Sequence, residues 1–429
     1  MLRYCRTCNE VRKSSMSHHQ VKRRRVFYIP GYDPIHPRRY RELYRKEGAA
    51  QAAVSGYEIA LRPKAGGGSY GWQVAGDFDG RAVTADVEVL IWSDIVRDSM
   101  SNSIPATYLQ LVQTAWVYIA SGALWRLMRL RKGPVIAALY PVLFLLGQLG
   151  LAALAVWVVM GIGRVVVAAI DPGWPGLGLI LTAISVIVGL GLGLGVLRWF
   201  RAQDGRFFAY YLMHDYAFSA RWKGANPPAL EQRMAAFGDS IAAALHEPVD
   251  EVLLVGHSSG AHLAVSVLAD LIRAGRVPAA GPALSFLSLG QVVPMMSFLP
   301  KAHRLRGDLQ FLSESDALTW VDVTAPGDGC AFALCDPVAV SGVARDGKRW
   351  PLVLSAAFTQ TLSPARWKAL RWRFFRLHFQ YLCAFDRPGD YDYFAITAGP
   401  LTLADRYHGR SPSKSRIDRA VSGHVSVAP

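Results

Sequence analysis

The 429-residue sequence predicts an α/β fold, a doubly wound and mostly parallel sheet with an inserted hairpin of apolar helices. Short apolar runs that resemble buried strands alternate with longer segments of helical pattern. This alternation is typical of a parallel sheet with helices on both faces. Two long uncharged stretches between residues 133 and 199 predict the hairpin. A chain of this length can form one large domain with such an insertion.

The first part of the sheet domain is expected over residues 24–98. A strand is predicted over 25–31, where an apolar run ends in a glycine turn, and a helix over 37–54. Further strands are predicted over 57–61 and 84–92. The second of these alternates at first and then becomes continuously apolar, as expected for a strand that enters a covered sheet.

The two uncharged stretches are each long enough to cross a bilayer. Residues 135–163 hold no charge over 29 positions and residues 177–197 hold none over 21, whereas about 20 helical residues span the hydrocarbon core. The outer flanks are basic, with Arg126, Arg129, Arg131, Lys132, Arg198, Arg201 and Arg206. Because basic flanks stay in the cytoplasm, we expect a transmembrane hairpin over 133–199 in the plasma (inner) membrane, with the sheet domain cytoplasmic.

Glycine spacing in the second stretch favours close packing of the two helices. Two GxxxG pairs are formed by Gly189, Gly191, Gly193 and Gly195. Residues 99–132 are also mostly apolar, but an even number of spans must separate two halves of one sheet. We therefore expect an interfacial or linking helix there rather than a third span.

The second part of the sheet domain is expected over residues 200–405. Helices are predicted over 206–222, 229–246, 259–274, 302–313 and 365–384, and strands over 252–255, 284–290, 318–324 and 351–358. A polar tail follows over 406–429. At the other end, residues 1–23 form a basic arm.

Positive charge is concentrated near the N-terminus of a chain whose net charge is +15. The first 46 residues hold 13 Lys and Arg against three acids. Such a surface can bind nucleic acid, bind an anionic membrane or remain merely solvated. Because apolar spans follow, we favour an anionic lipid surface and expect no nucleic-acid partner.

The five cysteines are scattered, which fits a reducing compartment rather than a disulfide framework. Cys5, Cys8, His18 and His19 have the spacing of half a zinc site. One CxxC in a short basic segment is a weak metal signal. We expect no metal and no cofactor.

The most informative segment is Gly256-His257-Ser258-Ser259-Gly260, which lies between a predicted strand and a predicted helix. Gly-x-Ser-x-Gly in this context is typical of a nucleophile elbow, a tight turn that holds the serine hydroxyl above the sheet edge. On these residues the chain resembles the α/β-hydrolase superfamily. The resemblance covers about residues 24–98 and 206–400, with the hairpin as an insertion.

The resemblance implies a nucleophile, an acid and a histidine in that order along the chain. Ser258 would be the nucleophile. Asp328 is the favoured acid, because it lies in the loop after a strand, whereas Asp322 lies within that strand and Asp336 comes later. Asp322 is expected to be a structural carboxylate.

His378 is the favoured base, because it follows the last strand and lies in a His-x-x-Tyr sequence; His408 in the polar tail is the alternative. His257 and His262 are expected to be packing or pocket residues. The resemblance also implies an oxyanion hole formed by the N–H groups of Ser259 and, from the loop after the first strand, Tyr32.

These features predict a membrane-anchored serine hydrolase of the esterase or lipase kind, acting on an ester or thioester of a small molecule or lipid through an acyl-enzyme. The alternative from another class is a catalytically silent hydrolase-like scaffold or interaction module at the membrane.

Overall fold

The computed structural model describes residues 20–64, 69–100, 103–170 and 175–429. The expected half zinc site of Cys5, Cys8, His18 and His19 lies outside the described residues, as does most of the basic arm. Eight strands are described: β1 (Arg23–Ile29), β2 (Glu58–Pro63), β3 (Gly71–Phe78), β4 (Arg81–Val89), β5 (Glu251–His257), β6 (Ala283–Leu289), β7 (Thr319–Thr324) and β8 (Leu352–Ser355).

These strands form one mixed sheet in the order β2-β3-β4-β1-β5-β6-β7-β8. All neighbours from β4 through β1 to β8 run parallel, whereas β3 is antiparallel to both β2 and β4. The predicted α/β class is confirmed. The sequence prediction missed β3, which makes the sheet mixed.

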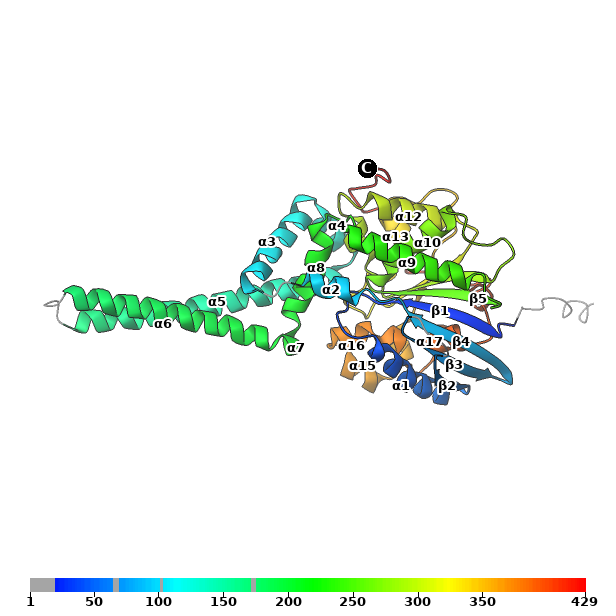
Figure 1. Cartoon of the computed structure of the whole chain (residues 1–429), viewed down its shortest axis with the longest axis horizontal. Helices are drawn as coiled ribbons and strands as arrows, with labels where there is room; N and C mark the ends of the chain where they lie inside the picture. The colour runs from blue at the N-terminus through cyan, green and yellow to red at the C-terminus, as the bar shows by residue number, and fades with distance from the viewer. Residues whose placement is uncertain (1–19, 65–68, 101–102, 171–174) are drawn as a thin grey trace, which may run out of the picture.

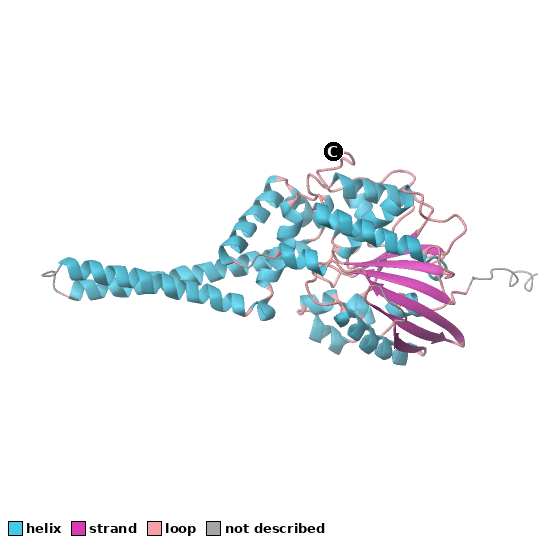
Figure 2. Cartoon of the chain, viewed as in Figure 1, coloured by secondary structure: helices cyan, strands magenta, loops and turns pink. Residues whose placement is uncertain are grey.

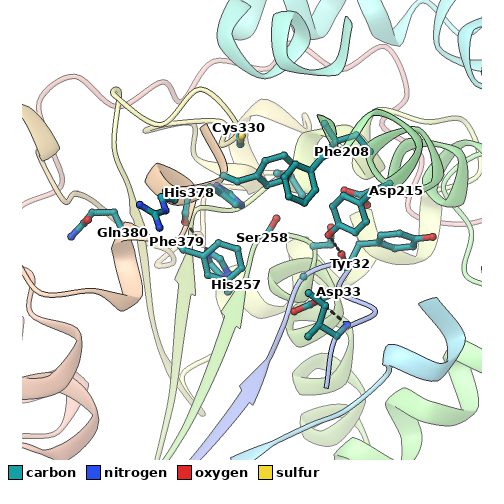
Figure 3. Close-up of a pocket in the computed structure, with 18 of the residues that line it drawn as sticks. Tyr32, Asp33, Phe208, Asp215, His257, Ser258, Cys330, His378, Phe379 and Gln380 are labelled. Atoms are coloured by element: carbon teal, nitrogen blue, oxygen red, sulfur yellow. Dashed lines mark hydrogen bonds between the residues drawn. The ribbon is translucent and has the colours of Figure 1, made fainter. Parts of the chain in front are cut away.

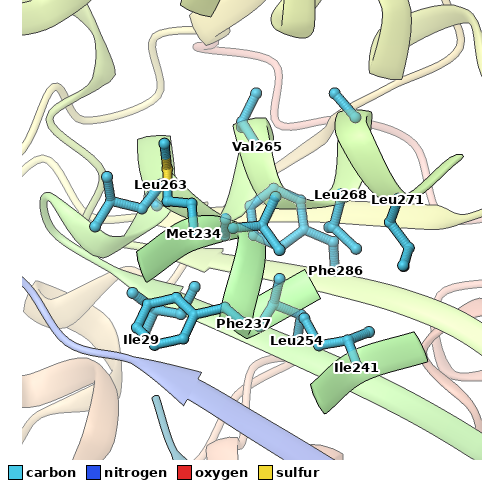
Figure 4. Close-up of a cluster of buried hydrophobic side chains, with 14 of the residues drawn as sticks. Ile29, Met234, Phe237, Ile241, Leu254, Leu263, Val265, Leu268, Leu271 and Phe286 are labelled. Carbon is cyan, nitrogen blue, oxygen red and sulfur yellow. The ribbon is translucent and has the colours of Figure 1, made fainter. Parts of the chain in front are cut away.

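Helices cover both faces of the sheet (Figures 1 and 2). One face packs against α9 (Pro228–Ala244), α10 (Gly260–Arg273) and α12 (His303–Glu314). Apolar side chains of α9 and α10 meet those of the central strands there; Figure 4 shows Phe237 and Leu268 among them. Burial of such side chains is the main stabilising contribution to folding.

The other face packs against α1 (Arg38–Ser55), α14 (Phe358–Thr361), α17 (Tyr393–Ala398) and α18 (Leu403–Arg406). Shorter helices α2 (Ser93–Ser99), α11 (Val293–Ser297) and α13 (Pro337–Val340) lie in the connections. The predicted single helix over 365–384 is wrong: the segment is divided into α15 (Pro364–Leu370), α16 (Phe374–His378) and a 3₁₀ turn, η2 (Gln380–Leu382).

Two long apolar helices, α5 (Lys132–Ala169) and α6 (Pro175–Ala202), project from the body as a hairpin (Figure 1). Each is long and apolar enough to cross a membrane. Only one of the two predicted glycine pairs faces the partner helix. A Cβ on Gly193 would lie 2.9 Å from a Val156 side-chain carbon, whereas one on Gly191 or Gly195 would meet nothing within 4 Å.

The base of the hairpin is joined to the body by α3 (Ile104–Ala120), α4 (Ala123–Leu130), α7 (Asp204–Phe207) and α8 (Ala209–Arg221). Tyr210 on α8 donates a hydrogen bond to Gln148 on α5 at 3.1 Å, and Tyr108 on α3 donates one to the Leu145 carbonyl at 2.8 Å. These bonds fix α5 to the body up to Gln148, beyond which the hairpin stands free.

Candidate active site

A tight turn joins β5 to α10 and holds Ser258 at its tip. Ser258 has a φ of 57°, in the left-handed region that residues with a side chain rarely occupy. Space requires the flanking glycines: a Cβ on Gly260 would lie 2.1 Å from the Ile29 carbonyl oxygen, and one on Gly256 would lie 2.7 Å from the Ala261 Cα. The close approach of β1 therefore explains Gly260, and the tightness of the turn itself explains Gly256.

The loop after β1 passes directly beside the serine. A Cβ on Gly31 would lie 3.3 Å from Ser258 Oγ, so the glycine lets the backbone approach the hydroxyl. Within the described residues, the N–H groups of Tyr32 and Ser259 donate to no acceptor, and both residues line the same pocket as Ser258. Two unpaired N–H groups beside a hydroxyl can bind an oxygen that gains negative charge.

Asp328 and His378 form a buried hydrogen-bonded pair. Asp328 lies in the loop after β7 and His378 ends α16, and Asp328 Oδ2 is 2.7 Å from His378 Nδ1. The same carboxylate accepts hydrogen bonds from the Tyr381 hydroxyl at 3.1 Å and the Cys330 N–H at 2.9 Å. Burial alone raises the pKa of Asp328, but His378 and these donors together hold it below the ordinary value. Asp328 is therefore a carboxylate that orients His378.

Ser258 and His378 line one pocket, and the buried Asp328 is hydrogen-bonded to His378. In the view of Figure 3, Ser258 lies between His378 and the pair Phe208 and Asp215. Among the described residues, no hydrogen bond joins Ser258 Oγ to His378. Hydrogen bonds between a nucleophile and its base are often long in ligand-free structures and tighten when a substrate binds.

His257 contacts the backbone of His378. His257 Nε2 lies 3.0 Å from the His378 carbonyl oxygen, and its Nδ1 lies 3.3 Å from the Tyr28 hydroxyl. Burial, with the nearby His378, lowers the pKa of His257 to about 3, so the ring is neutral and can donate through Nε2. His262 also lines the pocket, and burial lowers its pKa to about 4. Both are neutral packing groups.

The alternative acids and the alternative histidine lie elsewhere. Asp322, within β7, accepts a hydrogen bond from Ser288 at 2.5 Å, and Asp336 caps α13 and pairs with Lys348 at 2.6 Å. His408 is exposed beyond α18 and does not line the pocket. Of the three acids, only Asp328 contacts His378.

Asp322 is expected to make folding stability depend on pH. Burial raises its pKa to about 8, although the Ser288 hydrogen bond opposes the shift, whereas an unfolded Asp titrates near 3.9. The folded state binds this proton more tightly than the unfolded state does. The contribution of Asp322 to the free energy of unfolding is therefore complete below about pH 4 and is lost as pH rises through about 8. In Asp322→Asn, the free energy of unfolding should no longer show this fall with pH, which amounts to up to about 1.4 kcal/mol per pH unit.

Unfolding midpoints of detergent-solubilised wild type and Asp322→Asn, followed by tryptophan fluorescence from pH 5 to 8, test this expectation. The wild type should lose stability faster than the variant as pH rises. Equal slopes would show that Asp322 is ionised in the folded protein. Asp215, whose pKa is also raised, contributes equally to both proteins and therefore cancels in the comparison.

A cavity of about 910 Å³ opens above Ser258. Aromatic side chains from α8 and α16 form part of its wall: Tyr211 and Phe375 have ring centroids 6.1 Å apart, and Phe208 lies 5.2 Å from Phe375. Asp215 on α8 also lines the cavity, and burial raises its pKa to about 7. The sequence prediction missed the contribution of α8, because no local pattern shows which face of that helix meets the serine.

One group of side chains has the spacing of a metal site. Ligand atoms of Asp328, Cys330 and His378 all lie within 4.8 Å of one another. Burial raises the pKa of the Cys330 thiol well above its ordinary value, which disfavours the thiolate that binds metals. The Asp328 carboxylate and the His378 imidazole are hydrogen-bonded to each other, and this hydrogen bond explains why the ligand atoms lie so close together.

In comparisons with known proteins, no protein-family model, no curated protein and no solved structure matches the chain. Function therefore has to be inferred from the residues and geometry of the site.

Proposed function

We propose that this protein is a membrane-anchored serine hydrolase that cleaves an ester or thioester through an acyl-enzyme, with the α/β-hydrolase architecture. The main support is that a strained, partly exposed Ser258 lines one pocket with His378, which is hydrogen-bonded to the buried Asp328. The chain order of serine, acid and histidine is that of α/β-hydrolases.

In the proposed reaction, Ser258 Oγ attacks the substrate carbonyl while His378 Nε2 takes its proton. Asp328 holds the proton on Nδ1, which leaves Nε2 free to accept, and stabilises the imidazolium that forms. The N–H groups of Ser259 and Tyr32 bind the oxyanion. His378 then protonates the leaving alcohol or thiol. Water attacks the acyl-enzyme by the reverse sequence and restores Ser258.

Labelling with a fluorophosphonate tests the proposal directly, because this reagent phosphonylates only an activated serine. We expect the label on Ser258 and not on the adjacent Ser259, as mapped by mass spectrometry of the digested protein. An unlabelled, correctly folded protein would favour the silent scaffold instead.

The hairpin is the proposed membrane anchor. At 1.5 Å per residue, the 38 residues of α5 extend about 57 Å, nearly twice the hydrocarbon thickness of about 30 Å. Because α5 is fixed to the body up to Gln148, the segment from 149 to Ala169 is left to cross the bilayer. The exposed apolar face of α3, which includes Leu109, Val112 and Trp116, suits a helix at the interface.

Membrane sedimentation and cysteine labelling test the anchor. The protein should sediment with membranes and resist both high salt and alkaline carbonate, since apolar spans do not depend on charge. In a variant lacking Cys5 and Cys8, Ile170→Cys at the hairpin tip should react with an impermeant maleimide added outside spheroplasts.

Ser411→Cys, on the exposed surface of the body, is the matched control and should react only after lysis. Labelling of position 411 but not of position 170 from outside would show that the topology is the reverse of the proposed one, with the body outside. Release by salt alone would rule out the transmembrane anchor.

A further inference from the structure

The entrance of the cavity carries more unpaired positive than negative charge. Five cationic side chains line the cavity: Arg39, Lys46, Arg366, Arg373 and Arg376. Arg39 pairs with Asp33 at 3.3 Å, and Arg366 lies 3.7 Å from Glu47. Within the described residues, the side chains of Lys46, Arg373 and Arg376 have no acidic partner, and all three are exposed. These three residues are termed the cationic rim.

Four acids line the cavity against the five cations: Asp33, Glu47, Asp204 and Asp215. Asp33 is held by Arg39 and by the Tyr40 hydroxyl, and Asp204 accepts the N–H groups of Tyr210 and Tyr211 at 2.8 and 3.0 Å. Asp215 is half protonated near neutral pH, because burial raises its pKa to about 7. A substrate therefore meets a net positive field at the entrance.

Two residues of the cationic rim, Arg373 and Arg376, lie next to the base of the hairpin. Phe208, which follows α7, packs against Phe375 on α16, the helix that also carries Arg376. Pro134 and Gly205, at the two ends of the hairpin, line the cavity together with Arg373 and Arg376. In Figure 1, α15 and α16 lie beside α7, on the side of the body from which the hairpin projects. The cavity thus lies on the side of the body from which the proposed anchor projects.

Resting on the proposed function, we propose that Lys46, Arg373 and Arg376 form an anion-binding subsite, so that the substrate is a lipid-like ester whose head group carries a phosphate. The acyl chain packs along the aromatic wall of Phe208, Tyr211 and Phe375, and the ester carbonyl reaches Ser258. Arginine binds phosphate oxygens through two parallel N–H groups, which suits a rim with two arginines.

Two soluble esters that differ only in the phosphate test the proposal: dihexanoylphosphatidic acid and dihexanoylglycerol, both as monomers below their critical micelle concentrations. We expect the detergent-solubilised wild type to show a kcat/KM at least tenfold higher for the phosphate ester. In the double variant Arg373→Gln/Arg376→Gln, this ratio should fall at least tenfold.

Lys368→Gln is the matched control, because Lys368 is an exposed cation on the neighbouring α15 that does not line the cavity. Its ratio should stay within twofold of wild type. An unchanged ratio in the double variant would overturn the anion subsite while leaving Ser258-dependent hydrolysis intact. If Lys368→Gln also lowered the ratio of the two kcat/KM values at least tenfold, general surface charge rather than the proposed subsite would attract the phosphate. Failure to hydrolyse either ester, with no label on Ser258, would instead defeat the proposed function.

Discussion

Ser258→Ala is expected to lower the turnover of a p-nitrophenyl ester by about 10⁶-fold and to abolish fluorophosphonate labelling. The substitution removes the only atom that forms the acyl-enzyme bond, so the remaining oxyanion donors act on a substrate with no nucleophile. The residual rate should be that of water attack at the site, about 10³–10⁴-fold above the uncatalysed reaction. Steady-state kinetics on purified protein in detergent measures both effects.

Folding has to be checked separately, because the turn is strained. An alanine keeps the left-handed φ of residue 258 and fits the same space, so the unfolding midpoint should stay within a few degrees of wild type. Ser259→Ala is the matched control, since that residue contributes its backbone N–H and not its hydroxyl. Turnover of Ser258→Ala within tenfold of wild type would remove Ser258 from the reaction.

The serine turn could be predicted because its sequence pattern is local. The strand was predicted over 252–255 and is observed as Glu251–His257, and the helix predicted over 259–274 is observed as Gly260–Arg273. An apolar run followed by closely spaced glycines is enough to predict both elements, although the space that requires Gly260 is bounded by the distant Ile29. The placement of Asp328 after β7 followed equally from the strand pattern.

The missed strand β3 has a tertiary cause. Its sequence contains Gly71 and Gly76, which are typical of loops. A Cβ at Gly71 would lie 2.3 Å from the Val87 carbonyl oxygen, and one at Gly76 would lie 2.7 Å from the Ala398 carbonyl oxygen. The glycines therefore serve close packing against β4 and the end of α17, which the local sequence does not reveal.

The division of the predicted helix 365–384 also depends on distant contacts. A Cβ on Gly327 would lie 2.7 Å from the Trp367 ring, and one on Gly329 would lie 3.2 Å from the Phe374 ring. Two aromatic side chains of this segment thus pack on the loop that carries Asp328, and a single straight helix could not follow that loop. The break places His378 against Asp328.

Asp328→Asn is expected to lower turnover by about 10⁴-fold while leaving the fold intact. Asparagine has nearly the same shape, but its amide can donate a hydrogen bond to His378 Nδ1, which favours the tautomer with the proton on Nε2. That tautomer cannot accept the proton of Ser258. The Cys330 N–H can still donate to the amide oxygen, which takes the place of Oδ1. The Tyr381 hydroxyl donates to Oδ2 in the wild type, so in the variant it has to accept a hydrogen bond from the amide NH₂.

Asp322→Asn and Asp336→Asn provide matched controls, because each alters an equally buried acid that has no contact with His378. Both should keep turnover within about tenfold of wild type when corrected for the folded fraction, because mutations of this kind act through stability. Steady-state kinetics of the three variants, with circular dichroism to measure folding, separates the roles. A mild effect of Asp328→Asn together with a large loss in either control would show that a different carboxylate orients His378 for the transfer of the proton from Ser258.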